Sequence, residues 1–146
     1  MQGDRAICDI LNRLGTEIDV SDAPDLVPAL AVAAALHPGV TRITGAARLR
    51  IKESDRLVSV ADMLTALGAN VQILDDGLII RSASILTGGT VNGCNDHRIV
   101  MAAAIAATAA SGPVTITDAQ AVAKSYPAFF EDFTALGGIA HVESSR

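Results

Sequence analysis

The feature that most constrains the fold is an apolar pattern that recurs along the chain, each time ending in Leu-Gly. In every copy, apolar residues lie eight, seven, four and one positions before the glycine, which is the spacing of one helix face. Glycine suits the left-handed conformation that caps many helices. The pattern therefore predicts three capped amphipathic helices. Their apolar residues are Ile7, Cys8, Leu11 and Leu14, then Val60, Ala61, Leu64 and Leu67, then Phe129, Phe130, Phe133 and Leu136.

Each of these helices is followed by residues that alternate as in a strand. The apolar positions of the three expected strands are Ile18 and Val20, Val71 and Ile73, and Ala140 and Val142. Asp76-Gly77 indicates a hairpin turn after the second strand, returning through residues 78–80. A second, Ala-rich helix is expected at residues 29–36 and again at 99–110, leading into strands within 39–46 and 112–119. The chain is therefore predicted to have an α/β fold built from repeated units.

The repeat also predicts how the chain is divided. Two nearly whole units are expected at residues 22–82 and 92–143, whereas residues 1–21 match only the second half of a unit. We therefore expect the sequence to begin in the middle of a repeat. The alternative is an N-terminal helix that only happens to share the apolar pattern, because terminal repeats are often atypical.

Composition excludes several classes of protein. A net charge of −5 and only four aromatic residues argue against a nucleic-acid binder. The longest weakly polar run, residues 99–110, is too short to cross a bilayer, and the N-terminus has no signal-peptide layout. Cys8 and Cys94 show no metal-ligand spacing, so we expect reduced thiols in a cytoplasmic protein.

Charged residues collect in loops that lead into predicted helices, where free N–H groups and the helix dipole favour anions. Before residue 57, Arg48, Arg50, Lys52 and Arg56 form a basic patch, although solvated surface charge is an equally good explanation. In the same loop, Ser54 is expected to cap the helix and Asp55 to lie in its first turn.

Residues 95–98 open the next helix, with Asn95 or Asp96 as the expected N-cap. Arg98 gains nothing from the helix dipole at that position, which favours a ligand-binding role, whereas His97 is more often a packed or solvated residue.

Two further loops contain a proline that suits a helix start. Pro127 is expected in the first turn after Lys124, which stands at nearly the same repeat position as Lys52. Pro24-Asp25 is a routine helix start, but Asp25 can also pair with Glu53 for proton transfer. Together the loops predict a binding site for a small anionic molecule. This site would contain two cations and two carboxylates.

The same loops contain three spaced motifs, Lys52-Glu-Ser-Asp-Arg56-Leu, Asn95-Asp-His-Arg98 and Ala123-Lys-Ser-Tyr-Pro127. In this order and register they resemble the motifs of the EPSP synthase (3-phosphoshikimate 1-carboxyvinyltransferase) family, to which Gln2-Gly3-Asp4 and Pro24-Asp25 are also similar. The resemblance spans essentially the whole chain. It implies a fold of two domains made from βαβαββ units, of which this sequence would supply about two units plus a partial one, the last part of a longer chain.

The resemblance also implies a reaction. The family transfers the enolpyruvyl group of phosphoenolpyruvate to the 5-hydroxyl of shikimate 3-phosphate by addition and elimination, without a metal or an organic cofactor. Glu53 is expected to handle the methylene proton, and Asp25 to orient or deprotonate the hydroxyl. The remaining residues implied in substrate binding are Arg56 and Arg98 for the phosphoenolpyruvate carboxylate, Lys124 near its phosphate, Lys52 for shikimate 3-phosphate, and Arg48, where the family often has a different polar residue.

The missing N-terminal part of the enzyme would carry the other phosphate ligands, so the chain alone is expected to fold but not to turn over. Two other interpretations remain open at this point. One is the related enolpyruvyl transferase that acts on UDP-N-acetylglucosamine, against which the motifs argue. The other is a non-catalytic βαβ-repeat module that binds a protein partner, in which Asp25 and Glu53 would tolerate replacement.

Overall fold

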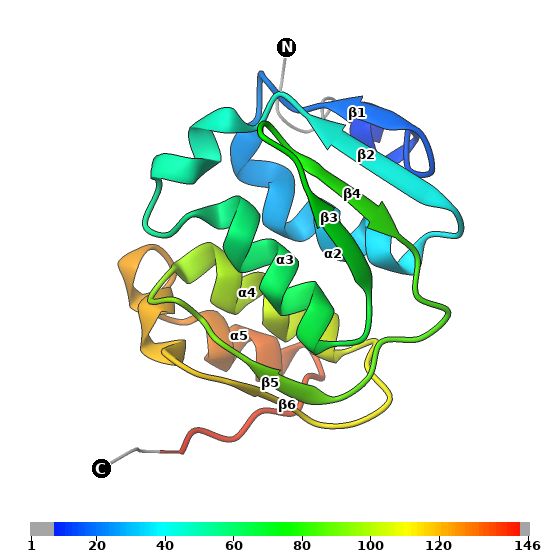
Figure 1. Cartoon of the computed structure of the whole chain (residues 1–146). Helices are drawn as coiled ribbons and strands as arrows, with labels where there is room; N and C mark the ends of the chain where they lie inside the picture. Colours follow the sequence, from blue (N-terminus) through cyan, green and yellow to red (C-terminus); the bar gives the residue numbers. More distant parts are fainter. Residues whose placement is uncertain (1–7, 144–146) are drawn as a thin grey trace.

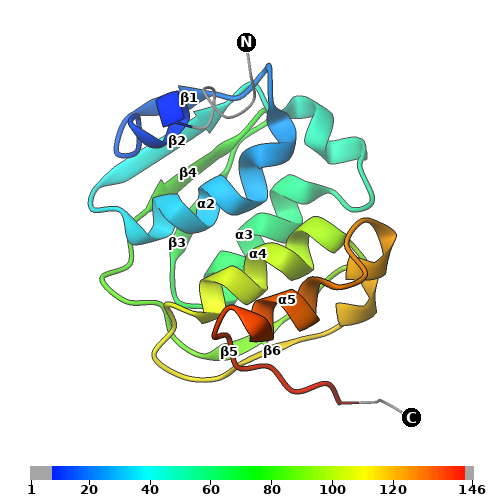
Figure 2. The same ribbon diagram turned by 180° about the vertical axis from the view of Figure 1, so that it is seen from behind.

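Helices lie between a four-stranded sheet and a separate pair of strands (Figures 1 and 2). The structure is a computed structural model that describes residues 8–143. Residues 8–11 are helical, and the four-stranded sheet follows with β1 (Glu17–Asp19), β2 (Val40–Thr44), β3 (Asn70–Ile73) and β4 (Leu78–Arg81). Its order is β1-β2-β4-β3, with β1 and β2 parallel and the other neighbours antiparallel.

Two helices connect the strands of this sheet. The short 3-10 helix η1 (Pro24–Leu26) leads into α2 (Val27–Leu36) between β1 and β2. The 3-10 helix η2 (Ala47–Ile51) then leads into α3 (Arg56–Ala66) between β2 and β3. The element order from β1 to β4 is therefore βαβαββ, which confirms the predicted fold class.

The second half begins in the same way but is shorter among the described residues. Strand β5 (Gly89–Val91), helix α4 (His97–Ala107) and strand β6 (Val114–Ile116) form a parallel βαβ unit. The 3-10 helix η3 (Ala119–Lys124) and helix α5 (Phe129–Ala135) follow. Helices α2, α3 and α4 contact one another between the two sheets, and α2 is apolar almost all round because both sides of it are buried. None of the helices within residues 8–143 combines the length and apolar character needed to cross a bilayer.

The predicted helix ends and hairpin are confirmed. Gly15, Gly68 and Gly137 all have positive φ, of 86°, 94° and 105°. The turn at Asp76-Gly77 joins β3 to β4, and the Leu74 amide donates to the Gly77 carbonyl. Ile7 and the Gln2-Gly3-Asp4 motif lie outside the described residues. The division into units at residues 1–21, 22–82 and 92–143 stays a prediction.

Three local predictions are wrong. Residues 140–142 form no strand, because no described segment pairs with them as β4 pairs with β3. The N-cap of α3 is Asp55 and not Ser54, since the Asp55 carboxylate accepts from the amides of Leu57 and Val58 while the Ser54 hydroxyl donates to Asp96. Pro127 precedes the N-cap of α5, Ala128, and so lies just outside the first turn.

The hairpin gives a test of the fold. A Cβ at Gly77 would overlap the backbone carbonyl of Ile43, whereas a Cβ at Gly112 would meet no atom closer than 3.6 Å. We expect Gly77→Ala to lower the free energy of unfolding by about 1–3 kcal/mol, as overpacking does elsewhere. Gly112→Ala should change it by less than about 0.5 kcal/mol. Urea denaturation of both variants checks this. Equal changes in the free energy of unfolding would contradict the position of the Gly77 turn against Ile43 of β2.

Candidate active site

The starts of η1, α3 and α4 meet at one end of the molecule. Helices α3 and α4 begin side by side there, and η1 contacts η2 next to them (Figure 1). Asp55 and Asp96 cap α3 and α4 with their carboxylates, so the N-terminal amides are partly satisfied by side chains. This arrangement brings together the polar side chains within residues 22–25, 52–56 and 95–98.

The centre of this cluster is the guanidinium of Arg56. Its side chain is only 2% exposed although it carries a full charge. The Nε and Nη2 atoms donate to the two oxygens of Asp96, at 2.9 and 3.2 Å. Nη1 donates to Asp25 at 3.0 Å, and Nη2 also donates to Glu53. A buried charge is tolerated only when it is paired and hydrogen-bonded, and these three carboxylates meet that requirement.

Asp96 is the most buried member of the cluster, with a fully buried side chain. It also accepts a hydrogen bond from the Ser54 hydroxyl at 2.8 Å and from the Arg98 backbone amide at 3.0 Å. Burial by itself raises the pKa of Asp96, but hydrogen bonds from Arg56 and Ser54, the Arg56 charge and the Arg98 amide together outweigh it. The pKa of Asp96 is therefore held below its ordinary value of 3.8.

Two further cations border the cluster. The Lys52 ammonium lies 3.9 Å from Asp25, and Arg98 Nη1 is 3.4 Å from the Asp25 carbonyl oxygen. Arg98 and Asp25 also line one end of a shallow pocket of about 130 Å³ between α2 and α4. Its other lining residues are apolar: Pro28, Ala29, Met101, Ala102 and Ile105. The arrangement can bind a small anion beside two carboxylates able to exchange protons.

The structure thus brings together five of the predicted site residues, namely Asp25, Lys52, Glu53, Arg56 and Arg98. Arg48 lies in η2 and Lys124 is the last residue of η3, and both contact the backbone instead. Arg48 donates to the Ser21 carbonyl at 2.9 Å, and Lys124 to the carbonyl of Asn95, next to Asp96 in the chain.

Sequence reasoning missed the part that Asp96 plays, because an acid before a helix is sufficiently explained as an N-cap.

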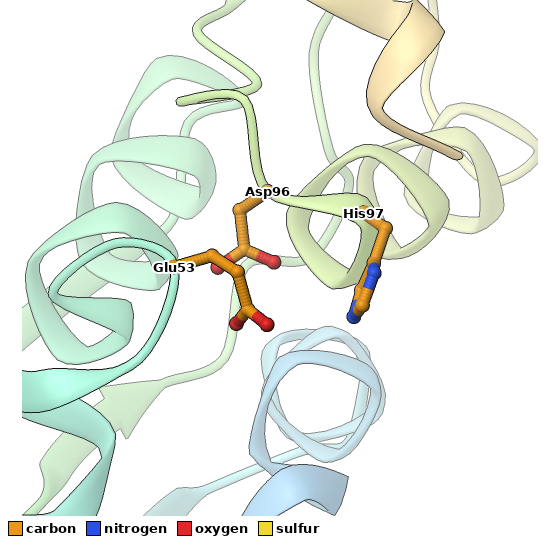
Figure 3. A group of neighbouring side chains, drawn as sticks. All are labelled: Glu53, Asp96 and His97. Carbon is orange, nitrogen blue, oxygen red and sulfur yellow. The ribbon is translucent and has the colours of Figure 1, made fainter. Parts of the chain in front are cut away.

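Glu53, Asp96 and His97 form a close group (Figure 3), with potential ligand atoms within 4.8 Å of one another. A divalent cation there would be repelled by Arg56, which already binds both carboxylates. The group is therefore better explained by Arg56 than as a metal site. His97 Nδ1 is buried without a hydrogen-bond partner among the described residues.

Acidification should reveal the role of Asp96. Because its pKa is lower in the folded chain than when unfolded, it stabilises the fold above about pH 4, and this contribution is lost as the pH falls through the lowered value. Asp96→Asn lacks the contribution at every pH. The difference in unfolding free energy between the wild type and Asp96→Asn should therefore shrink between about pH 5 and pH 2, measured by urea denaturation. A difference that stays constant over this range would contradict the assignment.

Comparison with known proteins agrees with this geometry. The family model described as EPSP synthase (3-phosphoshikimate 1-carboxyvinyltransferase) matches residues 5–133. The 3-phosphoshikimate 1-carboxyvinyltransferase of Clostridium acetobutylicum is 48% identical over 158 residues, covering 97% of this chain and 37% of the relative. That of Clostridium novyi is 46% identical, covering 95% and 36%. The chain therefore spans little more than a third of the length of these curated relatives.

A solved structure is similar as well. The 2.37 Å structure of the EPSP synthase from Acinetobacter baumannii superposes with a TM-score of 0.81 at 39% identity, over 86% of this chain and 30% of that one. The sequence motifs, the βαβαββ element order and the matching family model lead to one conclusion: this chain belongs to the EPSP synthase family.

Proposed function

We propose that this chain contributes acid–base and anion-binding groups to the transfer of the enolpyruvyl group of phosphoenolpyruvate to the 5-hydroxyl of shikimate 3-phosphate, with release of phosphate. The observation that carries the proposal is the meeting of Asp25 and Glu53 at one guanidinium, with Lys52 and Arg98 alongside. The relatives bear the name of this activity. We place the reaction in the cytoplasm, on the shikimate route to aromatic amino acids.

The chemistry needs proton transfer at two places. In the addition step, the acceptor oxygen bonds to C2 of phosphoenolpyruvate while its hydroxyl proton leaves and the methylene carbon gains a proton. In the elimination step, the resulting methyl group loses a proton and the bond from C2 to the phosphate oxygen breaks. We assign the carbon-centred transfers to Glu53 and the hydroxyl to Asp25, because carboxylates suit both tasks.

The cations are assigned to the negative groups of the substrates. Arg56 and Arg98 bind the phosphoenolpyruvate carboxylate, for which a planar guanidinium is well shaped. Lys124 binds near its phosphate, Lys52 contacts shikimate 3-phosphate, and Arg48 is assigned to substrate binding without a particular group. No metal or organic cofactor enters this scheme. The remaining phosphate ligands are assigned to the other part of the enzyme, which is the partner that we propose for this chain.

A chimera tests the function most directly. The chain would replace the matching 37% of the Clostridium acetobutylicum relative, and phosphate release from both substrates would be measured. We expect an active enzyme whose kcat falls about 10²- to 10⁴-fold on Glu53→Gln, the usual effect of losing a general acid or base. Asp62→Asn, a matched change at an exposed residue of α3, should leave kcat unchanged.

Three controls separate the alternatives. The 146-residue chain alone is expected to release no phosphate. Replacing shikimate 3-phosphate by UDP-N-acetylglucosamine should abolish phosphate release, and activity with that acceptor would favour the related transferase. A chimera that keeps full activity in both Asp25→Asn and Glu53→Gln would favour a non-catalytic module instead.

A further inference from the structure

The two edges of the Arg56 guanidinium are occupied in different ways. On the side edge, Nε and Nη2 bind both oxygens of one residue, Asp96. On the end edge, Nη1 and Nη2 each bind one oxygen from a different residue, Asp25 and Glu53. A guanidinium edge commonly binds both oxygens of a single carboxylate. The end edge therefore has the geometry to receive one ligand carboxylate, but two protein side chains hold its donors.

The partners on the two edges also differ in burial. The Asp96 side chain is 0% exposed, whereas Asp25 is 46% and Glu53 41% exposed. Removing Asp96 from Arg56 would leave a buried charge without a partner, which is strongly unfavourable. Asp25 and Glu53 can instead turn into water and recover their hydration, so their ion pairs with Arg56 are easily exchanged.

The neighbours of Asp96 restrain it further. The Ser54 hydroxyl and the Arg98 amide both donate to it, so that Asp96 connects the loop before α3 with the start of α4. Asp25 has a different set of neighbours, since Lys52 lies 3.9 Å from its carboxylate. This lysine remains as a counter-charge for Asp25 when the bond to Arg56 is broken.

We infer that Asp96 is the fixed, positioning partner of Arg56, and that Asp25 and Glu53 are exchangeable partners that a ligand carboxylate displaces from the end edge. The inference deepens the proposed function and rests on it for the identity of the ligand, phosphoenolpyruvate. Displacement frees the two proposed catalytic carboxylates at the moment when the substrate binds. The groups that transfer protons are thus kept on Arg56 until there is a substrate to act on.

The two kinds of partner should affect the dissociation constant of phosphoenolpyruvate in opposite directions when they are replaced. Asp25→Asn and Glu53→Gln each remove a competitor, so each should tighten phosphoenolpyruvate binding by about 2- to 5-fold, in keeping with a weak exposed ion pair. Asp96→Asn should weaken it at least 10-fold, because Arg56 loses the partner that orients it.

Nuclear magnetic resonance of the 146-residue chain tests the assignment without a ligand. The Arg56 Nε–Hε resonance should persist in Asp25→Asn and in Glu53→Gln, and should broaden or vanish in Asp96→Asn. Ser54→Ala, which removes one hydrogen bond to Asp96 but no charge, should shift it and serves if Asp96→Asn does not fold. A resonance that survives the loss of Asp96 but not that of Asp25 or Glu53 would overturn the inference.

Titration of the 146-residue chain with phosphoenolpyruvate, followed by nuclear magnetic resonance, tests whether the ligand displaces Asp25 and Glu53 from Arg56. The carboxyl carbon resonances of Asp25 and Glu53 should move, while that of Asp96 stays in place. Movement of Asp96 together with the other two, or no movement of Asp25 and Glu53 at any concentration, would overturn the exchange. The proposed function is tested separately by the activity of the chimera. A failure of the exchange can therefore be distinguished from a failure of the proposed function.

Discussion

The ion pair between Arg56 and Asp96 is the interaction on which the rest of the site depends. Both side chains are almost wholly removed from water, at 2% and 0% exposed. Each would be unstable there without the other, because an unpaired buried charge is strongly unfavourable. Arg56 belongs to α3 and Asp96 caps α4, so their pairing fixes the two helix starts relative to each other. The more exposed Asp25 and Glu53 then occupy the outer side of an arginine that is already in place.

Most of the fold could be predicted from the sequence because its signals are local. The spacing of apolar residues before Gly68 specifies a helix face, and the glycine ends the helix with a positive φ. Asp76-Gly77 likewise marks a turn that depends on adjacent residues. The strand expected at residues 140–142 failed for the opposite reason. A strand exists only when another segment pairs with it, and alternation in the sequence does not reveal whether that segment is present.

The site was predictable as a set of residues but not as a set of bonds. Their position in charged loops before predicted helices, together with the family resemblance, placed Asp25, Glu53 and Arg56 in one site, and the structure does bring them together. Their direct pairing, and the 40 positions that separate Arg56 from Asp96, have no signature in the sequence. Ser54 shows the same limit. It was expected to cap α3, but its hydroxyl is used by Asp96, a residue of another loop.

Double-mutant cycles test whether Asp96 is the fixed partner of Arg56. The unfolding free energies of the wild type, Arg56→Gln, Asp96→Asn and the variant with both changes give the coupling energy of the buried pair. Those of the wild type, Arg56→Gln, Asp25→Asn and the variant with both of these changes give the coupling energy of the outer pair. We expect a coupling energy of about 2–3 kcal/mol between Arg56 and Asp96, and of less than about 1 kcal/mol between Arg56 and Asp25. Equal coupling energies, or a larger one for Asp25, would contradict Asp96 as the fixed partner of Arg56.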